Sequence, residues 1–326
     1  MKRNKALAIG ATAVAVGVAA AGGRRAARRR SQRAPLPPAP QDALFELPDD
    51  VTHRTVPTPD GGELHLIERG EGRPLVLLHG ITLRADVWAP QFHQLSDRYR
   101  VIAVDLRGHG TSTAGADGYG LPRLATDVAT LLEALDLRDA VLVGHSMGGM
   151  TIMQFCGDHP AVLDERVAGV VFVATRAHAV VPALAAGFMR RAGDRAQARL
   201  DAGGTIPQSA AISGRMARVA FGRRPSPVAV AQVAEMSTSI PPEAFLPSGL
   251  GLLDHDARDA LRGTHTPSMV IVGTRDLLTP VRSSKHLAGL LEGSHLHVLP
   301  GAGHQLMQER PDELAQLIDD FVADAL

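Results

Sequence analysis

The chain has 326 residues, of which 45% are hydrophobic and 3% aromatic, and its 34 basic and 34 acidic side chains give a formal net charge of zero. This length suffices for one large domain or two small ones with a sizeable core. The neutral balance and the few aromatic residues argue against nucleic-acid binding, which needs basic surfaces and base-stacking platforms. Cys156 is the only cysteine, so an intrachain disulfide and a thiolate metal cluster are both excluded.

The N-terminal segment has a pattern typical of membrane targeting. Three basic residues among the first five precede an uncharged Ala/Val/Gly run over residues 6–23, and six arginines follow by residue 33. A basic start before an apolar run favours a secretory signal peptide, whereas the basic far flank favours a short anchor with the rest of the chain in the cytoplasm. We predict that residues 1–30 make the protein membrane-associated or exported; the alternative is an unstructured leader. The Pro-rich residues 31–49 are expected to form an extended linker.

Beyond this linker, residues 50–326 alternate between strand-like and helical patterns. Residues 63–68 follow a Pro-Asp-Gly-Gly turn and predict a hairpin with a strand that begins near Thr52. Compact apolar runs predict buried strands at 74–79, 100–105, 141–143, 170–173, 269–272 and 295–299. Apolar residues at helical spacing occupy 124–135 and the segment that starts at Pro311. This alternation predicts an α/β fold with a mostly parallel sheet and helices on both faces.

The stretch over residues 177–262 breaks the alternation. It contains helical patches with Pro and Gly interruptions and no clear strand. An insertion between two strands of such a sheet usually lies above their carboxyl ends, where ligands bind, so we predict a helical cap; the alternative is a second, independently folded domain. Six apolar cap residues are candidates for an acyl pocket or for simple packing: Phe188, Met189, Met216, Phe221, Met236 and Phe245.

The segment from 139 to 149 carries the clearest chemical signal. An apolar run, 141–143, leads to Ser146, which is flanked by Gly144 and Gly148, and a helix-compatible segment follows. A serine at such a turn needs a strained backbone and a close approach of strand and helix, so that a Cβ at either flanking position would clash. The pattern predicts a nucleophile elbow; the alternative is a glycine-rich turn with a capping serine.

A serine nucleophile needs a histidine to take its proton and a carboxylate to orient that histidine. Asp276 follows the predicted strand 269–272, and His304 follows the predicted strand 295–299, so both belong at the carboxyl edge of the sheet. The other candidate acids, Asp254 and Asp256, lack this strand-to-loop position. We therefore predict Ser146, Asp276 and His304 as the catalytic residues.

Acyl transfer also needs donors for the oxyanion, each worth about 3 kcal/mol. We expect these donors to be the backbone N–H groups of Met147 and Ile81, since Gly80 allows close approach to a substrate; His79 is expected to brace the loop. His295 and His297 share one face of a strand, but no third ligand is evident, so no metal is predicted. The mechanism needs no cofactor.

Five stations of the chain together resemble the α/β-hydrolase superfamily: His79-Gly80, residues 105–112, residues 144–149, residues 273–276 and Gly303-His304. The resemblance covers roughly residues 51–326 without the cap. It implies an eight-stranded, mostly parallel sheet with a helical lid after the sixth strand, and a structural role for residues 105–112. Family members that are haloalkane dehalogenases or epoxide hydrolases use an aspartate nucleophile, and Ser146 argues against those reactions.

The resemblance and the residues together predict a serine hydrolase that acts on a small apolar ester, lactone or thioester through an acyl-enzyme. The Gly-His-Ser-Met-Gly-Gly pattern resembles that of carboxylesterases and monoacylglycerol lipases. It is also similar to cofactor-free haloperoxidases (perhydrolases) and carbon–carbon bond hydrolases, which use the same three residues. A binding protein that keeps the fold without turnover is the alternative from another class. The sequence decides neither the substrate nor the oligomeric state.

Overall fold

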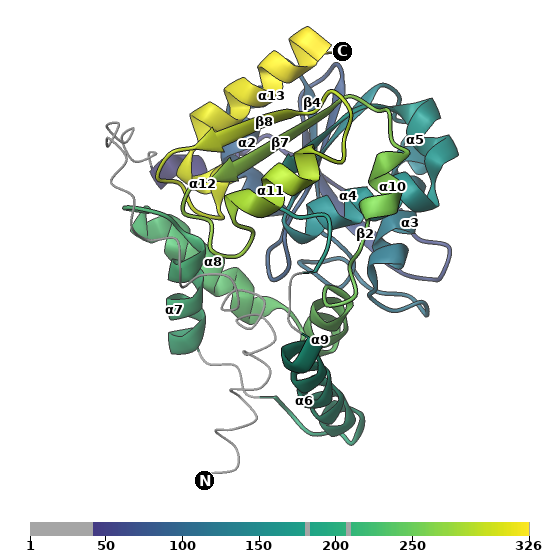
Figure 1. Ribbon diagram of the computed structural model, residues 1–326, viewed down its shortest axis with the longest axis vertical. Helices are drawn as coiled ribbons and strands as arrows, with labels where there is room; N and C mark the ends of the chain where they lie inside the picture. The colour runs from purple at the N-terminus through teal and green to yellow at the C-terminus, as the bar shows by residue number, and fades with distance from the viewer. Residues whose placement is uncertain (1–41, 180–182, 207–209, 326) are drawn as a thin grey trace.

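The computed structural model describes residues 42–179, 183–206 and 210–325 (Figure 1). Within these residues one sheet of eight strands has the order β1-β2-β4-β3-β5-β6-β7-β8. The strands are β1 Thr52–Pro57, β2 Glu63–Arg69, β3 Pro74–Leu78, β4 Arg100–Val104, β5 Ala140–His145, β6 Val167–Val173, β7 Ser268–Gly273 and β8 His295–Leu299. β2 pairs antiparallel with β1 and β4, and all the other pairs are parallel. The predicted hairpin and the predicted mostly parallel sheet are therefore confirmed.

Helices cover both faces of the sheet (Figure 1). They are η1 Asp42–Phe45, η2 Ala85–Trp88, α2 Ala89–Leu95, α3 Leu121–Ala134, α4 Met147–Asp158, α5 Pro160–Arg166, α6 Ala183–Asp201, α7 Ala210–Ala220, α8 Pro227–Ser239, α9 Pro242–Gly251, α10 Arg258–Arg262, α11 Val281–Ala288, α12 Leu306–Glu309 and α13 Pro311–Ala325. Side chains alternate along each strand, so Val76 and Leu78 of β3 join the core with α3 and α4, whereas Leu75 and Leu77 join the core with α2 and α13.

The predicted cap insertion contains helices α6 to α10 between β6 and β7. α7 packs against α8 and α6 against α9, and these four helices extend below the sheet in Figure 1. Met189, Phe221 and Met236 are buried in apolar clusters. Phe188 is 64% exposed, so it lines no pocket here and the expectation for this residue is wrong.

None of the helices in the described ranges is long and apolar enough to cross a membrane. The predicted targeting segment, residues 1–30, and most of the predicted linker lie outside the described residues.

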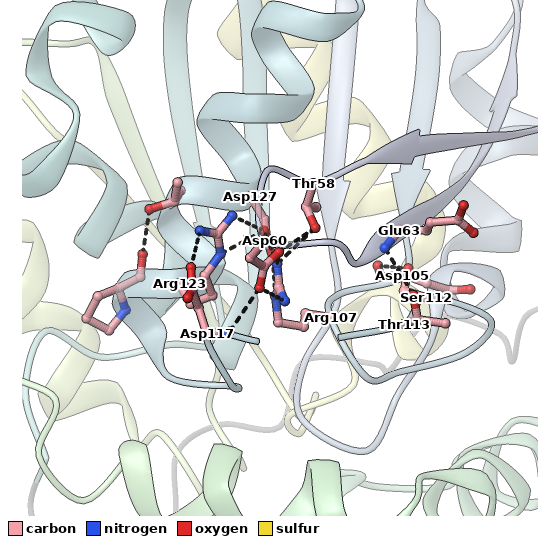
Figure 2. Close-up of polar contacts among 12 residues, drawn as sticks. Thr58, Asp60, Glu63, Asp105, Arg107, Ser112, Thr113, Asp117, Arg123 and Asp127 are labelled. Carbon is pink, nitrogen blue, oxygen red and sulfur yellow. Dashed lines mark hydrogen bonds and ion pairs between the residues drawn. The ribbon is translucent and has the colours of Figure 1, made fainter. Parts of the chain in front are cut away.

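A buried arginine fixes the loop that follows β4 (Figure 2). Arg107 is fully buried, and its guanidinium donates to Asp60 of the β1–β2 turn at 2.7 Å and to both carboxylate oxygens of Asp127 on α3 at 2.7 and 2.8 Å. Two carboxylates and several hydrogen bonds compensate for removing this cation from water. The loop is thereby held to the hairpin and to α3.

The same loop supports its neighbour on the carboxyl edge through Asp105. Its carboxylate accepts the backbone N–H of Ala85 at 2.7 Å and that of Thr111 at 3.0 Å, and it contacts His65 Nδ1 at 2.9 Å. Burial opposes ionisation of Asp105, but these donors outweigh it and lower the pKa of the carboxyl below its usual value. The loops after β3 and β4 are thus tied together, which confirms the structural role expected for residues 105–112.

We predict that Arg107→Met lowers the free energy of unfolding by about 3–5 kcal/mol, because Asp60 and Asp127 would remain buried without their cation. Urea denaturation measures the loss. Arg138→Met is the control, since Arg138 makes an ion pair with Glu165 in which both side chains are more than half exposed, and such pairs contribute less than about 1 kcal/mol. Equal losses in the two variants would contradict the prediction.

Candidate active site

Ser146 lies at a strained turn between β5 and α4, with φ 52° and ψ −112°. A Cβ added to Gly148 would lie 2.3 Å from the carbonyl oxygen of Leu78, and one added to Gly144 would lie 2.6 Å from the backbone nitrogen of Gly149. Both flanking glycines are therefore required by contact, as the sequence predicts. The Ser146 N–H donates to the carbonyl of Val173 at 3.0 Å, which fixes the turn against the end of β6.

His304 and Asp276 form a buried pair on the loops after β8 and β7. His304 Nδ1 lies 2.9 Å from Asp276 Oδ2. The other donors to Asp276 are the N–H groups of Leu278 and Thr279, both at 2.8 Å, and the hydroxyl of Thr279 at 2.6 Å. These bonds stabilise the carboxylate and orient the imidazole, which leaves His304 Nε2 as the available base.

His145 links this pair to Ser146. Its ring centroid lies 4.6 Å from that of His304, and its Nε2 donates to the carbonyl of His304 at 3.0 Å. Burial, together with the neighbouring His304, lowers the pKa of His145 well below its usual value, so this ring is neutral. Because His145 directly precedes Ser146, the structure brings the three predicted catalytic residues to one edge of the sheet.

The loop after β3 lies directly against the serine. A Cβ added to Gly80 would lie 3.1 Å from the Cβ of Ser146 and 2.9 Å from His145 Nδ1. In the part of the chain that the structure describes, the N–H groups of Ile81 and Met147 have no hydrogen-bond acceptor. Two free donors beside a serine have the arrangement that an oxyanion site requires.

His79 braces this loop, as expected from the sequence. Its Nε2 accepts the backbone N–H of Leu106 at 3.0 Å, and its Nδ1 donates to the carbonyl of Gly80 at 2.7 Å. Burial, reinforced by the nearby His109, lowers the pKa of His79 to about 3. The ring is therefore neutral and structural rather than a second base.

The cap is hydrogen-bonded to the loop that carries His304. The His304 N–H donates to the carbonyl of Ala220 at the end of α7, at 2.6 Å. The carboxylate of Glu309 on α12 accepts the N–H of Gly222 from the cap at 2.8 Å and that of Gly303 from the histidine loop at 2.9 Å. Sequence reasoning missed Glu309, since a glutamate next to Arg310 near a helix end has the pattern of a solvated ion pair.

Among the described residues, no group of three His, Cys, Asp or Glu side chains could hold a metal ion. His295 is exposed and His297 half-buried on β8. The geometry therefore points to acid–base and nucleophilic chemistry at Ser146.

Comparison with known proteins gives the same class. Residues 73–311 match the family described as alpha/beta hydrolase fold. The chain is 33% identical over 270 residues to the pimeloyl-[acyl-carrier protein] methyl ester esterase of Aeromonas hydrophila, which is 78% of this chain and 98% of that protein. It is 47% identical over 103 residues to the non-heme chloroperoxidase CPO-A1 of Kitasatospora aureofaciens, but this match covers only 31% of this chain and 38% of that protein.

The structure of a thermophilic esterase from Thermogutta terrifontis superimposes with a TM-score of 0.72 and 28% identity, covering 84% of this chain and 99% of that one. The chain belongs to the alpha/beta hydrolase fold family. Its relatives include esterases and chloroperoxidases.

We predict that Ser146→Gly is more stable than Ser146→Ala by about 1 kcal/mol. Both substitutions remove the hydroxyl, but only alanine keeps a Cβ on a backbone with positive φ, and such strain costs on the order of 1–3 kcal/mol, partly offset by the greater freedom of glycine in the unfolded chain. Urea denaturation of the two variants measures the difference. An alanine variant as stable as the glycine variant would show that the turn is not strained.

We also predict that Glu309 makes stability depend on pH. Burial raises the pKa of Glu309 from 4.5 to about 7, although the N–H groups of Gly222 and Gly303 oppose the rise. Between these values the folded chain binds a proton that the unfolded chain does not, so the contribution of the neutral carboxyl is present below pH 4.5 and is lost as the pH rises through 7. The expected loss is about 3 kcal/mol.

Urea denaturation of the wild type and of Glu309→Gln between pH 5 and pH 8 tests this prediction. The difference in unfolding free energy between the two proteins should change across this range, because the glutamine does not titrate. Parallel curves would mean that Glu309 does not titrate in the folded protein.

Proposed function

We propose that the protein is a serine hydrolase that cleaves carboxylic esters, lactones or thioesters through an acyl-enzyme. The observation that carries this proposal is the buried pair of His304 and Asp276, 2.9 Å apart, packed through His145 against the strained turn of Ser146. This arrangement supplies a nucleophile, a base and a group that orients the base. Esterases among the relatives support the same reaction class.

In the proposed mechanism, Ser146 Oγ attacks the acyl carbonyl while His304 Nε2 takes the serine proton. Asp276 holds the imidazole and stabilises the imidazolium that forms. The N–H groups of Ile81 and Met147 stabilise the oxyanion, each by about 3 kcal/mol. His304 then protonates the departing alcohol or thiol, and the same histidine activates a water molecule that releases the acid. The mechanism requires no metal or cofactor.

A second candidate is perhydrolysis, in which hydrogen peroxide replaces water and a peracid is released. The 47% identity to a non-heme chloroperoxidase over 103 residues favours this alternative. Carbon–carbon bond hydrolysis and ligand binding without turnover remain alternatives that the same assays test. The proposed substrate is a small molecule, since the cap residues Phe221 and Met236 are buried and offer an apolar surround.

We predict that the protein hydrolyses 4-nitrophenyl esters of short and medium acids, and that Ser146→Ala lowers kcat at least a thousandfold. Asp276→Asn should lower kcat by a similar factor because the amide favours the wrong histidine tautomer. Asp254→Asn is the matched control: Asp254 is exposed and paired with Arg190, so its activity should match the wild type.

A fluorophosphonate should label the wild type and not Ser146→Ala. Peracid formation from acetate and hydrogen peroxide, measured by bromide oxidation, separates perhydrolysis from ester hydrolysis. An inert response to every ester together with an unlabelled Ser146 would overturn the proposed function. Tight ligand binding without turnover would then identify a binding protein.

A further inference from the structure

Arg176 lies at the carboxyl edge of the sheet, between the proposed nucleophile and the proposed acid. It follows β6, the strand between β5, which leads to Ser146, and β7, which leads to Asp276. Its preceding residues are fixed: the Ala174 N–H donates to the carbonyl of Ile271 at 2.8 Å, and the Thr175 hydroxyl donates to the carbonyl of Ser146 at 2.7 Å. The position of Arg176 is therefore set by the same contacts that hold the elbow.

The guanidinium of Arg176 is buried without a partner. The residue is 2% exposed, and its Nε has no hydrogen-bond acceptor. Within the described ranges its side chain makes no hydrogen bond and no ion pair, whereas Arg107, the other fully buried arginine described above, binds two carboxylates. An unpaired buried cation is strongly unfavourable, so the fold maintains a costly group at this place.

The nearby carboxylates are already engaged. Asp276 interacts with Arg176 only at long range, and all its hydrogen bonds go to His304, Leu278 and Thr279. Asp256 is paired with the guanidinium of Arg258.

The remaining neighbours of Arg176 are bases. His255 Nε2 donates to the backbone carbonyl of Arg176 at 3.1 Å; burial, with a contribution from the Arg176 charge, lowers the pKa of His255 to about 4. Burial and several neighbouring charges, Arg176 among them, also lower the pKa of His178. The local charge of Arg176 is therefore left uncompensated within the described chain.

We propose that Arg176 binds a carboxylate of the substrate, so that the preferred ester carries a second, ionised acid group. This inference rests on the proposed hydrolase function. A guanidinium matches a carboxylate with two parallel hydrogen bonds, and exclusion of water strengthens the pair. The place of Arg176 beside the serine and under the root of the cap puts the anion within the same site as the scissile bond.

The competing explanation is that Arg176 only balances the charge of Asp276. The two explanations differ in stability and in selectivity. A structural counter-charge stabilises the fold and acts on all substrates alike, whereas a substrate-binding cation reduces stability and acts on anionic substrates alone.

The test compares 4-nitrophenyl valerate with mono-4-nitrophenyl glutarate, which differ by a terminal carboxylate. The readout is the ratio of their kcat/KM values. We expect the wild type to favour the glutarate ester at least tenfold, mainly through KM, and Arg176→Met to lose this preference. Arg176→Lys should retain part of it, because lysine keeps the charge without the fork. Arg275→Met is the matched control, since Arg275 is exposed next to Asp276 and should leave the ratio unchanged.

A second pair, phenyl valerate and 4-carboxyphenyl valerate, places the carboxylate on the alcohol side. A preference in either pair that depends on Arg176 supports the proposal, and its absence from both overturns it. Thermal unfolding provides a readout that does not depend on turnover. An unchanged or higher Tm in Arg176→Met supports a binding role, whereas a lower Tm with equal losses on neutral and anionic esters identifies Arg176 as the counter-charge of Asp276.

Failure of the proposed function would be visible separately. If no ester is cleaved and fluorophosphonate does not label Ser146, the hydrolase proposal fails. Calorimetric binding of glutarate itself to the wild type and to Arg176→Met then tests the carboxylate site alone. Binding that is at least tenfold weaker in the variant supports the site, and equal binding or no binding overturns it.

Discussion

The backbones of β3, β5 and α4 approach so closely below Ser146 that Gly144 and Gly148 have no room for a side chain. This contact forces the turn at Ser146 into a conformation with positive φ and presents the serine at the edge of the sheet. Hydrogen bonds from the end of β6 hold the turn there, through the carbonyl of Val173 and the hydroxyl of Thr175. The other groups of the site lie on loops that pack against this turn, so their geometry depends on the same close approach.

Much of the fold and of the candidate site could be predicted from the sequence. The apolar strand runs and the glycines around Ser146 reflect local requirements, and parallel strands place Asp276 and His304 at the same edge. Glu309 could not be predicted in this way, because its bond to Gly222 joins residues 87 positions apart. Phe188 was misjudged for a related reason: an apolar cap residue becomes buried or exposed only through the packing of neighbouring helices, and local spacing does not encode that packing.

Two arginines show why partners, rather than residue type, separate scaffold from recognition. Both Arg107 and Arg176 follow a parallel strand within a few residues and both are buried. Arg107 binds Asp60 and Asp127 and so closes a structural loop (Figure 2). Arg176 has no such partner among the described residues. In sequence analysis the segment after β6 was searched for a carboxylate and dismissed when none was found, although a cation there is equally informative.

The bonds between the cap and the histidine loop bear on how such a protein can diversify. Caps in an α/β sheet are insertions and can in principle be exchanged as modules. Here Ala220 and Gly222 of the insertion hold the backbone of the residues at positions 303 and 304. A chimera that receives a foreign cap without residues 220–223 would therefore alter the placement of its own base. Selectivity and rate are mechanically joined, and new specificities are reached more readily through side chains of α6 and α9 than through replacement of the whole insertion.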